Sequence, residues 1–267
     1  MKKAKSGKIQ HAPENGMFAD ERRQRILSIL EADNRVEVED LSRRLGVSSD
    51  TIRRDLRQLD ARQLLHRTHG GAIKHLAPSL SYEVRQELSS LAKQSIGRLA
   101  ATLVEEGDAI IIGSGTTAYA LARSLTVHRA TVITNSLDAA LVLSSRPGIT
   151  LQVLGGRWNP SLHELVGEEA VRAVLRYRVG KVFLGVNGLS VQHGLTCSDA
   201  EEALLFQAMI ASSQEVIVLA DFSKLGEVGF AWVAPLKAIH YLVTDCNADV
   251  SELGNTGIQI LQTDSET

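Results

Sequence analysis

Seven short apolar runs recur between residue 108 and the end of the chain, and they constrain its fold more than any other feature. They are DAIIIG, ATVITN, ITLQVLGG, KVFLGVNG, EVIVLAD, AIHYLVTD and IQILQTD. The stretches between them are mostly about 10 to 20 residues long and have helical periodicity. Strands that alternate with helices predict an α/β domain with a mainly parallel sheet and helices on both faces. In such sheets, ligands bind at the carboxyl ends of the strands.

A different pattern fills the segment before this domain, from Asp20 to Leu65. Three helices are predicted, the first with Asp20 as its N-cap, the second ending at Gly46 and the third beginning after Ser48. Their buried faces are predicted to hold Ile26, Ile29, Leu30, Val38, Leu41, Leu45, Ile52, Leu56 and Leu59. Only GVS separates the last two helices, which is typical of a helix-turn-helix. Gly70-Gly71 in LLHRTHGGAIK then predicts a hairpin, so the domain is predicted to be a winged helix.

The exposed face of the third helix is rich in arginine, and the charge of the chain is uneven. Residues 1–76 hold 16 Lys and Arg against 11 Asp and Glu, whereas the remainder holds 13 against 20. Arginine can bridge guanine in the major groove, although an arginine-rich face is often only solvated. The predicted contacts to double-stranded operator DNA are Ser49, Thr51, Arg53, Arg54, Arg57, Arg67 and His69, with Lys2, Lys3, Lys5 and Lys8 as further phosphate contacts.

Composition divides the chain into four predicted parts. Residues 1–19 form a disordered basic tail, 20–76 the DNA-binding domain, 77–92 a polar linker and 93–267 the α/β domain. No run of about 18 apolar residues and no signal peptide is found, so a cytoplasmic protein without a membrane span is expected. The two cysteines, Cys197 and Cys246, are expected to be free, and neither a metal site nor a cofactor is predicted.

The first strand of the α/β domain runs into Gly113-Ser114-Gly115-Thr116-Thr117, which resembles a phosphate-binding turn. Backbone N–H groups, two hydroxyls and the positive end of the next helix can bind an anion there, although such a turn is often only structural. Polar residues that suit a polyol or its phosphate follow the other strands. The predicted effector site comprises Ser114, Gly115, Thr116, Thr117, Asn135, Ser136, Gly155, Gly156, Asn187, Glu202 and Lys224.

ERRQRILSIL, VSSDTIRRDLRQL and HRTHGGA together resemble the DeoR family of bacterial sugar-operon regulators. The resemblance implies that the α/β domain is a sensor resembling ribose-5-phosphate isomerase. It further implies that residues 114–117 hold the phosphate of the effector and that Asn187, Glu202 and Lys224 lie near its sugar. Asn187 stands where the isomerases carry Asp, and an amide is no general base. Glu201 or Glu202 could still serve as one.

The leading hypothesis is a repressor of a carbohydrate-utilisation operon that is relieved by a phosphorylated sugar. Since a helix-turn-helix binds paired half-sites, a homodimer or homotetramer is expected. Two alternatives stay open: a sugar-phosphate isomerase or deaminase fused to a DNA-binding domain, and a DNA-binding protein without an effector. The identity of the sugar and the choice between repressor and activator are not given by the sequence.

Overall fold

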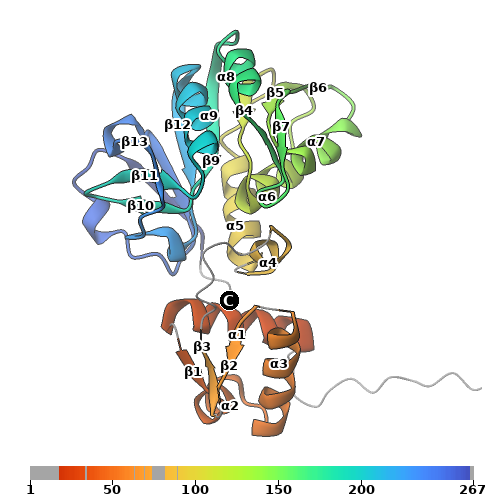
Figure 1. Ribbon diagram of the computed structural model, residues 1–267, viewed down its shortest axis with the longest axis vertical. Coiled ribbons are helices and arrows are strands. Elements are labelled where there is room, and N and C mark those ends of the chain that lie inside the picture. The colour runs from red at the N-terminus through yellow and green to blue at the C-terminus, as the bar shows by residue number, and fades with distance from the viewer. Residues whose placement is uncertain are drawn as a thin grey trace, which may run out of the picture. The chain divides into compact units, whose positions relative to one another are not determined.

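The computed structural model describes residues 18–264, apart from 34, 63, 69, 74–81 and 89. These residues form two compact units, an N-terminal unit within residues 1–76 and a C-terminal unit within residues 77–267 (Figure 1). No helix in the described part of the chain is both long enough and apolar enough to cross a membrane.

Three helices and a small sheet make up the N-terminal unit (Figure 1). The helices are α1 (Ala19–Asp33), α2 (Val38–Leu45) and α3 (Ser49–Ala61), and the strands are β1 (Arg35–Glu37), β2 (His66–Arg67) and β3 (Gly71–Ile73). Strand β3 lies between β1 and β2 and is antiparallel to both. A Cβ atom at Gly71 would lie 1.9 Å from the carbonyl oxygen of Val36, so glycine is needed where β3 meets β1. The β2–β3 hairpin is the predicted wing, and β1 was not predicted.

The core of the N-terminal unit follows the predicted helix faces closely. Its fully buried members include Ile26, Leu27, Leu30, Leu41, Ile52, Leu56 and Leu59. Ile29 is only half-buried, because Leu27 occupies the buried position that was predicted for Ile29. The prediction of Asp20 as the N-cap is also wrong, since α1 begins at Ala19 and Asp20 lies inside the first turn, paired with Arg23.

The seven apolar runs form the seven strands of the central sheet in the C-terminal unit. They are β4 (Ala109–Ile112), β5 (Ala130–Thr134), β6 (Ile149–Val153), β9 (Val179–Gly185), β12 (Ser213–Leu219), β14 (Tyr241–Thr244) and β15 (Gln259–Gln262). Their order is β15-β14-β12-β9-β4-β5-β6, and every neighbouring pair is parallel. The chain turns from one half of the sheet to the other between β4 and β9, and open parallel sheets bind ligands at such a point.

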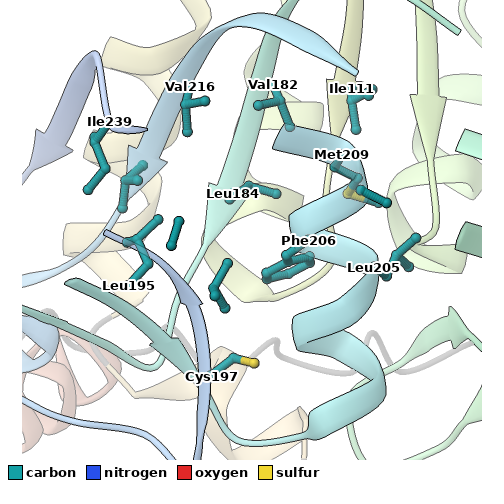
Figure 2. Packing of buried hydrophobic residues seen from close by; sticks show 14 of the residues in the cluster. Ile111, Val182, Leu184, Leu195, Cys197, Leu205, Phe206, Met209, Val216 and Ile239 are labelled. Atoms are coloured by element: carbon teal, nitrogen blue, oxygen red, sulfur yellow. The ribbon is translucent and has the colours of Figure 1, made fainter. Parts of the chain in front are cut away.

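Helices cover both faces of this sheet, as predicted. They are α5 (Ser90–Ala101), α6 (Thr116–Ser124) and α7 (Leu137–Ser144) on one face, and α8 (Glu168–Val174) and α9 (Ala200–Ala211) on the other. Successive strand residues point to opposite faces, so Ile111 packs in one core and Ile110 in the other. Figure 2 shows Phe206 and Met209 of α9 in the first core, beside Leu184 and Val182 of β9.

Smaller elements, which the sequence did not predict, surround the carboxyl edge of the sheet. They are the hairpin β7 (Arg157–Asn159) and β8 (Glu164–Val166), and the sheet of β10 (Gly188–Ser190), β11 (Gly194–Cys197) and β13 (Ala231–Ala234). The described part of the chain also contains three 3-10 helices, η1 (Phe222–Lys224), η2 (Leu236–Ala238) and η3 (Ser251–Leu253). Residues 77–92, predicted as linker, contain helix α4 (Tyr82–Glu87) and the start of α5.

Candidate functional site

The turn between α2 and α3 has the local geometry that its sequence predicts. Gly46 ends α2 in the left-handed conformation, with φ at 65°. Ser48 is the N-cap of α3, and its hydroxyl accepts a hydrogen bond of 3.3 Å from the backbone N–H of Thr51. The short turn therefore leaves α3 free to present its polar face, with Ile52, Leu56 and Leu59 turned inward.

Arginines occupy the outer face of α3. Arg53, Arg54 and Arg57 are exposed, and Arg53 pairs with Asp50 at 3.1 Å. Arg57 donates through Nε to the carbonyl of Arg53. Arg54 makes no hydrogen bond or ion pair with any residue that the structure describes, so its guanidinium is available for a base edge.

The other predicted DNA contacts that the structure describes lie in α3 and β2. Ser49 and Thr51 are half-buried in the first turn of α3. Arg67 is exposed on β2, and its backbone N–H donates to Asp60. His69 and the lysines at positions 2, 3, 5 and 8 lie outside the described residues.

A buried ion pair that the sequence did not predict joins α3 to α1. Asp55 is 4% exposed, and its Oδ2 accepts a hydrogen bond of 2.6 Å from Nε of Arg22. Arg22 Nη2 donates to the second carboxylate oxygen at 3.3 Å, and Arg23 Nε lies 3.4 Å from it. The two arginines therefore fix the inner side of the helix whose outer side carries the predicted DNA contacts.

In the C-terminal unit, the predicted phosphate-binding turn lies at the carboxyl end of β4. Gly115 precedes α6 with φ at 103°, a conformation that favours glycine, and Thr116 and Thr117 begin the helix. Both threonines are buried, at 9% and 7% exposure. A Cβ atom at Gly185, at the end of β9, would lie 3.4 Å from the carbonyl oxygen of Ser114. The turn therefore lies at the crossover point of the sheet.

The side chain of Ser114, which was predicted to contact a phosphate, is instead hydrogen-bonded to Glu164 of β8. The Ser114 hydroxyl donates a short hydrogen bond to Glu164 Oε2, and Asn135 Nδ2 donates to the same oxygen at 3.2 Å. Glu164 is fully buried. Only the backbone N–H of Ser114 is therefore available to an anion, because its hydroxyl already donates to Glu164.

A second buried carboxylate, Glu202 of α9, lies near Glu164. Burial raises the pKa of Glu164 to about 7, and the nearby carboxylate of Asp199 adds to the rise. Burial, and then the charge of Glu164, raises the pKa of Glu202 well above its ordinary value. Arg85 of α4 opposes both shifts. Strand β8 and helices α9 and α4 thus bring this acidic pair together with Arg85.

Helix α4 is anchored to this region by side chains that the sequence had left in a linker. The Tyr82 ring stacks on His163, with ring centroids 4.2 Å apart, and Arg85 Nη2 donates to the Ser161 carbonyl at 2.9 Å. Lys93 of α5 is buried and donates to the carbonyls of Arg85 and Leu88. The first helix after residue 81 is therefore docked against residues next to Glu164.

The remaining predicted site residues fall into two groups. Ser136 caps α7, and Asn187 Oδ1 accepts from the Ser198 N–H at 3.1 Å. A Cβ atom at Gly156 would lie 2.5 Å from the Val166 carbonyl, so Gly156 is needed where the chain passes β8. Gly155 is exposed beside it. These contacts give Ser136, Asn187 and Gly156 roles in the local backbone arrangement.

Lys224 belongs to a separate polar cluster after β12. Asp221 is buried, and although burial opposes it, Lys224 and Lys93 hold the pKa of Asp221 below its ordinary value. Lys93 also lines a cavity of about 200 Å³ between α5 and α6, together with Thr116, Tyr119, Arg98 and Arg123. Positive charge therefore lies on the α5 side of the turn, and the acidic pair lies on the β8 side.

Among the described residues, no group of three or more His, Cys, Asp and Glu side chains is arranged to hold a metal ion. Cys197 and Cys246 are free, and Cys197 Sγ donates to the Asp199 carbonyl. Burial, and then Glu202, raises the pKa of the Cys197 thiol above its ordinary value.

Two family models match the chain. One is a DeoR-like helix-turn-helix domain, over residues 22–75, and the other is a DeoR C terminal sensor domain, over residues 89–246. The HTH-type transcriptional repressor GlcR of Bacillus subtilis (strain 168) is 38% identical over 255 residues, which cover 94% of this chain and 98% of that protein. The HTH-type transcriptional regulator GlpR of Haloferax volcanii is 31% identical, over 92% and 98%. The lactose phosphotransferase system repressor of Streptococcus mutans serotype c is 32% identical, over 87% and 94%.

Among solved structures, ribose 5-phosphate isomerase A from Methanocaldococcus jannaschii has a TM-score of 0.36 and 19% identity, over 50% of this chain and 53% of that one. A likeness of this size carries no argument about function. The matches to curated relatives, in contrast, extend over both units.

Proposed function

Because the chain belongs to the DeoR family of helix-turn-helix transcriptional regulators, we propose that it represses a carbohydrate-utilisation operon and leaves its operator when a phosphorylated sugar binds to the C-terminal unit. The expectation of a regulator, not an enzyme, is confirmed, since its relatives are named as transcriptional regulators and repressors. Such a regulator would act in the cytoplasm, and binding to paired half-sites would require a homodimer or a homotetramer.

The observation that carries the effector proposal is the position of the α6 N-terminus at the crossover point of the sheet. The first N–H groups of a helix have no partner within the helix, and they attract anions. Here the N–H groups of residues 115–117 follow the end of β4, with the buried hydroxyls of Thr116 and Thr117 beside them. Lys93, which lines the adjoining cavity with Thr116, supplies positive charge. This combination suits a phosphate monoester.

The effector must bind two states of the protein unequally if it is to change operator affinity. Helix α4 is the first element of the C-terminal unit that the structure describes, and its Arg85 lies near Glu164 and Glu202. A ligand that binds beside Glu164 and Glu202 would therefore change their attraction for Arg85, and with it the position of α4. We assign the transmission of the signal to this contact.

Thr116→Ala is expected to weaken the response to the effector about tenfold without changing operator affinity, because it removes a hydroxyl that donates to the phosphate. The measurement titrates sugar phosphates into a complex of the full chain with an operator duplex enriched from random DNA, followed by fluorescence anisotropy. Thr131→Ala, at an exposed position of β5, is the control. Release of the operator by none of the sugar phosphates, with folded protein, contradicts the proposed function.

Arg54→Ala is expected to weaken operator binding by about 2 kcal/mol, or roughly 30-fold, and to relax the preference for one base pair. The reason is that Arg54 is exposed on α3 and makes no ion pair within the described residues. Anisotropy titrations on the operator and on single-base variants measure both effects. Arg25→Ala, on the exposed side of α1, serves as the matched loss of one positive charge. Equal effects of the two substitutions would remove Arg54 from the base contacts.

A further inference from the structure

Three buried oxygen atoms near the proposed phosphate-binding turn have no hydrogen-bond donor among the described residues. They are Asn135 Oδ1, Glu164 Oε1 and Glu202 Oε2. Asn135 and Glu164 are fully buried, and Glu202 is 6% exposed. A buried polar atom that is left unpaired costs about 1 to 3 kcal/mol, and more when it is charged. The described part of the chain therefore leaves three buried acceptors free for a ligand.

The orientation of Asn135 is fixed by its own hydrogen bonds. Its Nδ2 donates to Glu164 Oε2 at 3.2 Å and to the Leu165 carbonyl at 3.3 Å. These two acceptors identify Nδ2 as the nitrogen, so the free atom is the carbonyl oxygen. Glu164 Oε2 is likewise occupied by Asn135 and Ser114, which leaves Oε1 as the free acceptor.

Charge around these atoms is unbalanced as well. The titratable groups around them are Glu164 of β8, Glu202 of α9, Asp199 before α9 and Arg85 of α4, with the Cys197 thiol of β11 beside them. Three carboxyl groups thus stand against one guanidinium, and a further positive charge beside Glu164 and Glu202 would offset the burial that raises the pKa of both. Asp199 Oδ1 already accepts from the N–H groups of Glu201 and Glu202, and Arg85 Nη2 donates to the Ser161 carbonyl. Arg85 Nε is a buried donor that also lacks a partner among the described residues, so one unpaired donor stands against three unpaired acceptors.

An ammonium group would supply both hydrogen-bond donors and positive charge, since it carries three donors and one charge. A hydroxyl group supplies one donor and no charge. We infer that the effector is an amino sugar phosphate, whose ammonium group is bound by Glu164, Glu202 and Asn135 while its phosphate lies at the N-terminus of α6. This inference rests on the proposed function, because it assigns the other end of the same ligand. Ser114 joins the two ends, since it belongs to the phosphate-binding turn and its hydroxyl donates to Glu164.

The test compares two probes that differ only in this group, glucosamine 6-phosphate and glucose 6-phosphate, by isothermal titration calorimetry on the full chain. The amine is expected to bind at least about tenfold more tightly, as a charge-assisted hydrogen bond to buried carboxylates implies. Glu164→Gln keeps the shape of the side chain and is expected to bring the ratio of the two affinities close to one. Glu202→Gln is expected to lower the same ratio, so the inference stays testable if one of the two variants does not fold.

Glu201→Gln is the matched control, because Glu201 is the sequence neighbour of Glu202 and instead pairs with Arg157 at the surface. It is expected to leave the ratio unchanged. Equal binding of both probes to the unaltered chain, or a preference that survives Glu164→Gln and Glu202→Gln, overturns the inference and leaves the proposed function standing. Binding of neither probe also overturns the inference, whereas the proposed function is contradicted only if no sugar phosphate releases the operator. Stabilisation of the chain by Mg²⁺ alone, lost in Glu164→Gln, would assign the three oxygens to a metal ion and also overturn the inference.

Discussion

Asp55→Ala is expected to destabilise the N-terminal unit by about 3 kcal/mol, because removal of one partner leaves buried charge unpaired. The Asp55 carboxylate lies between Arg22 and Arg23, whose side chains are only 12% and 20% exposed. Arg22 contacts the Asp55 carboxylate through both Nε and Nη2. Hydrogen exchange followed by mass spectrometry measures the effect separately for each unit. Peptides from α1 and α3 are expected to lose about 100-fold in protection, and peptides from the central sheet almost nothing.

Glu21→Ala provides the control for this prediction, since it removes an acidic partner of an arginine on the same helix. The Arg25–Glu21 pair has side chains that are 56% and 40% exposed, and surface pairs contribute about 0 to 1 kcal/mol. A loss of protection no larger in Asp55→Ala than in Glu21→Ala would show that the buried pair contributes nothing to the fold of this unit.

The central sheet could be predicted from the sequence because its strands are buried on both faces. Such strands are continuous apolar runs, and all seven runs became strands of one parallel sheet. The helix-turn-helix was equally predictable, because Gly46 and Ser48 carry local signals for the end of one helix and the start of the next. In these parts of the chain, local sequence signals were sufficient to predict the structure.

Helix α4 and strand β1 could not be predicted, because neither is determined by its own sequence. Strand β1 has three residues and pairs with β3 at the far end of the unit. Helix α4 has six residues, too few for a stable isolated helix, and it is held by Tyr82 on His163 and by Arg85 on Ser161. Both elements depend on partners that lie 34 to 81 residues away in the chain.

The candidate site shows the same division. Ser114 to Thr117 were predicted from a local turn pattern, whereas Glu164 was missed because β8 is a three-residue strand between irregular segments. One signal was present: a glutamate preceding Leu165 and Val166, in a short apolar stretch, is unusual unless a partner satisfies it. Its partner Ser114 is 50 residues away, and only the fold brings the two together. Asn187, read as a lost catalytic carboxylate, accepts a hydrogen bond from the Ser198 N–H, a role that favours an oxygen acceptor whatever the chemistry.

The position of the phosphate-binding turn depends on how closely α6 packs on α5. Gly97 of α5 faces the backbone of α6, where a Cβ atom would lie 2.6 Å from the carbonyl carbon of Ala120 and 2.8 Å from the N atom of Leu121. Backbone atoms cannot rotate away as the end of a flexible side chain can. Replacement of glycine by alanine inside a helix ordinarily gains up to about 1 kcal/mol. Here the contact with α6 reverses the sign, because the two helices must separate.

Gly97→Ala is therefore expected to destabilise the C-terminal unit by about 3 kcal/mol, at the upper end of what overpacking costs, and to weaken effector binding by displacing Thr116 and Thr117. Hydrogen exchange in α5 and α6 measures the first effect, and calorimetry with the sugar phosphate measures the second. Gly254→Ala is the matched control, because its φ of −58° suits alanine and its Cβ atom would meet nothing closer than 3.6 Å. That variant is expected to be neutral or about 0.5 kcal/mol more stable. If Gly97→Ala behaved in the same way, α6 would be free to move away from α5 at little cost, and the N-terminus that we propose to bind the phosphate would not be held in place by this contact.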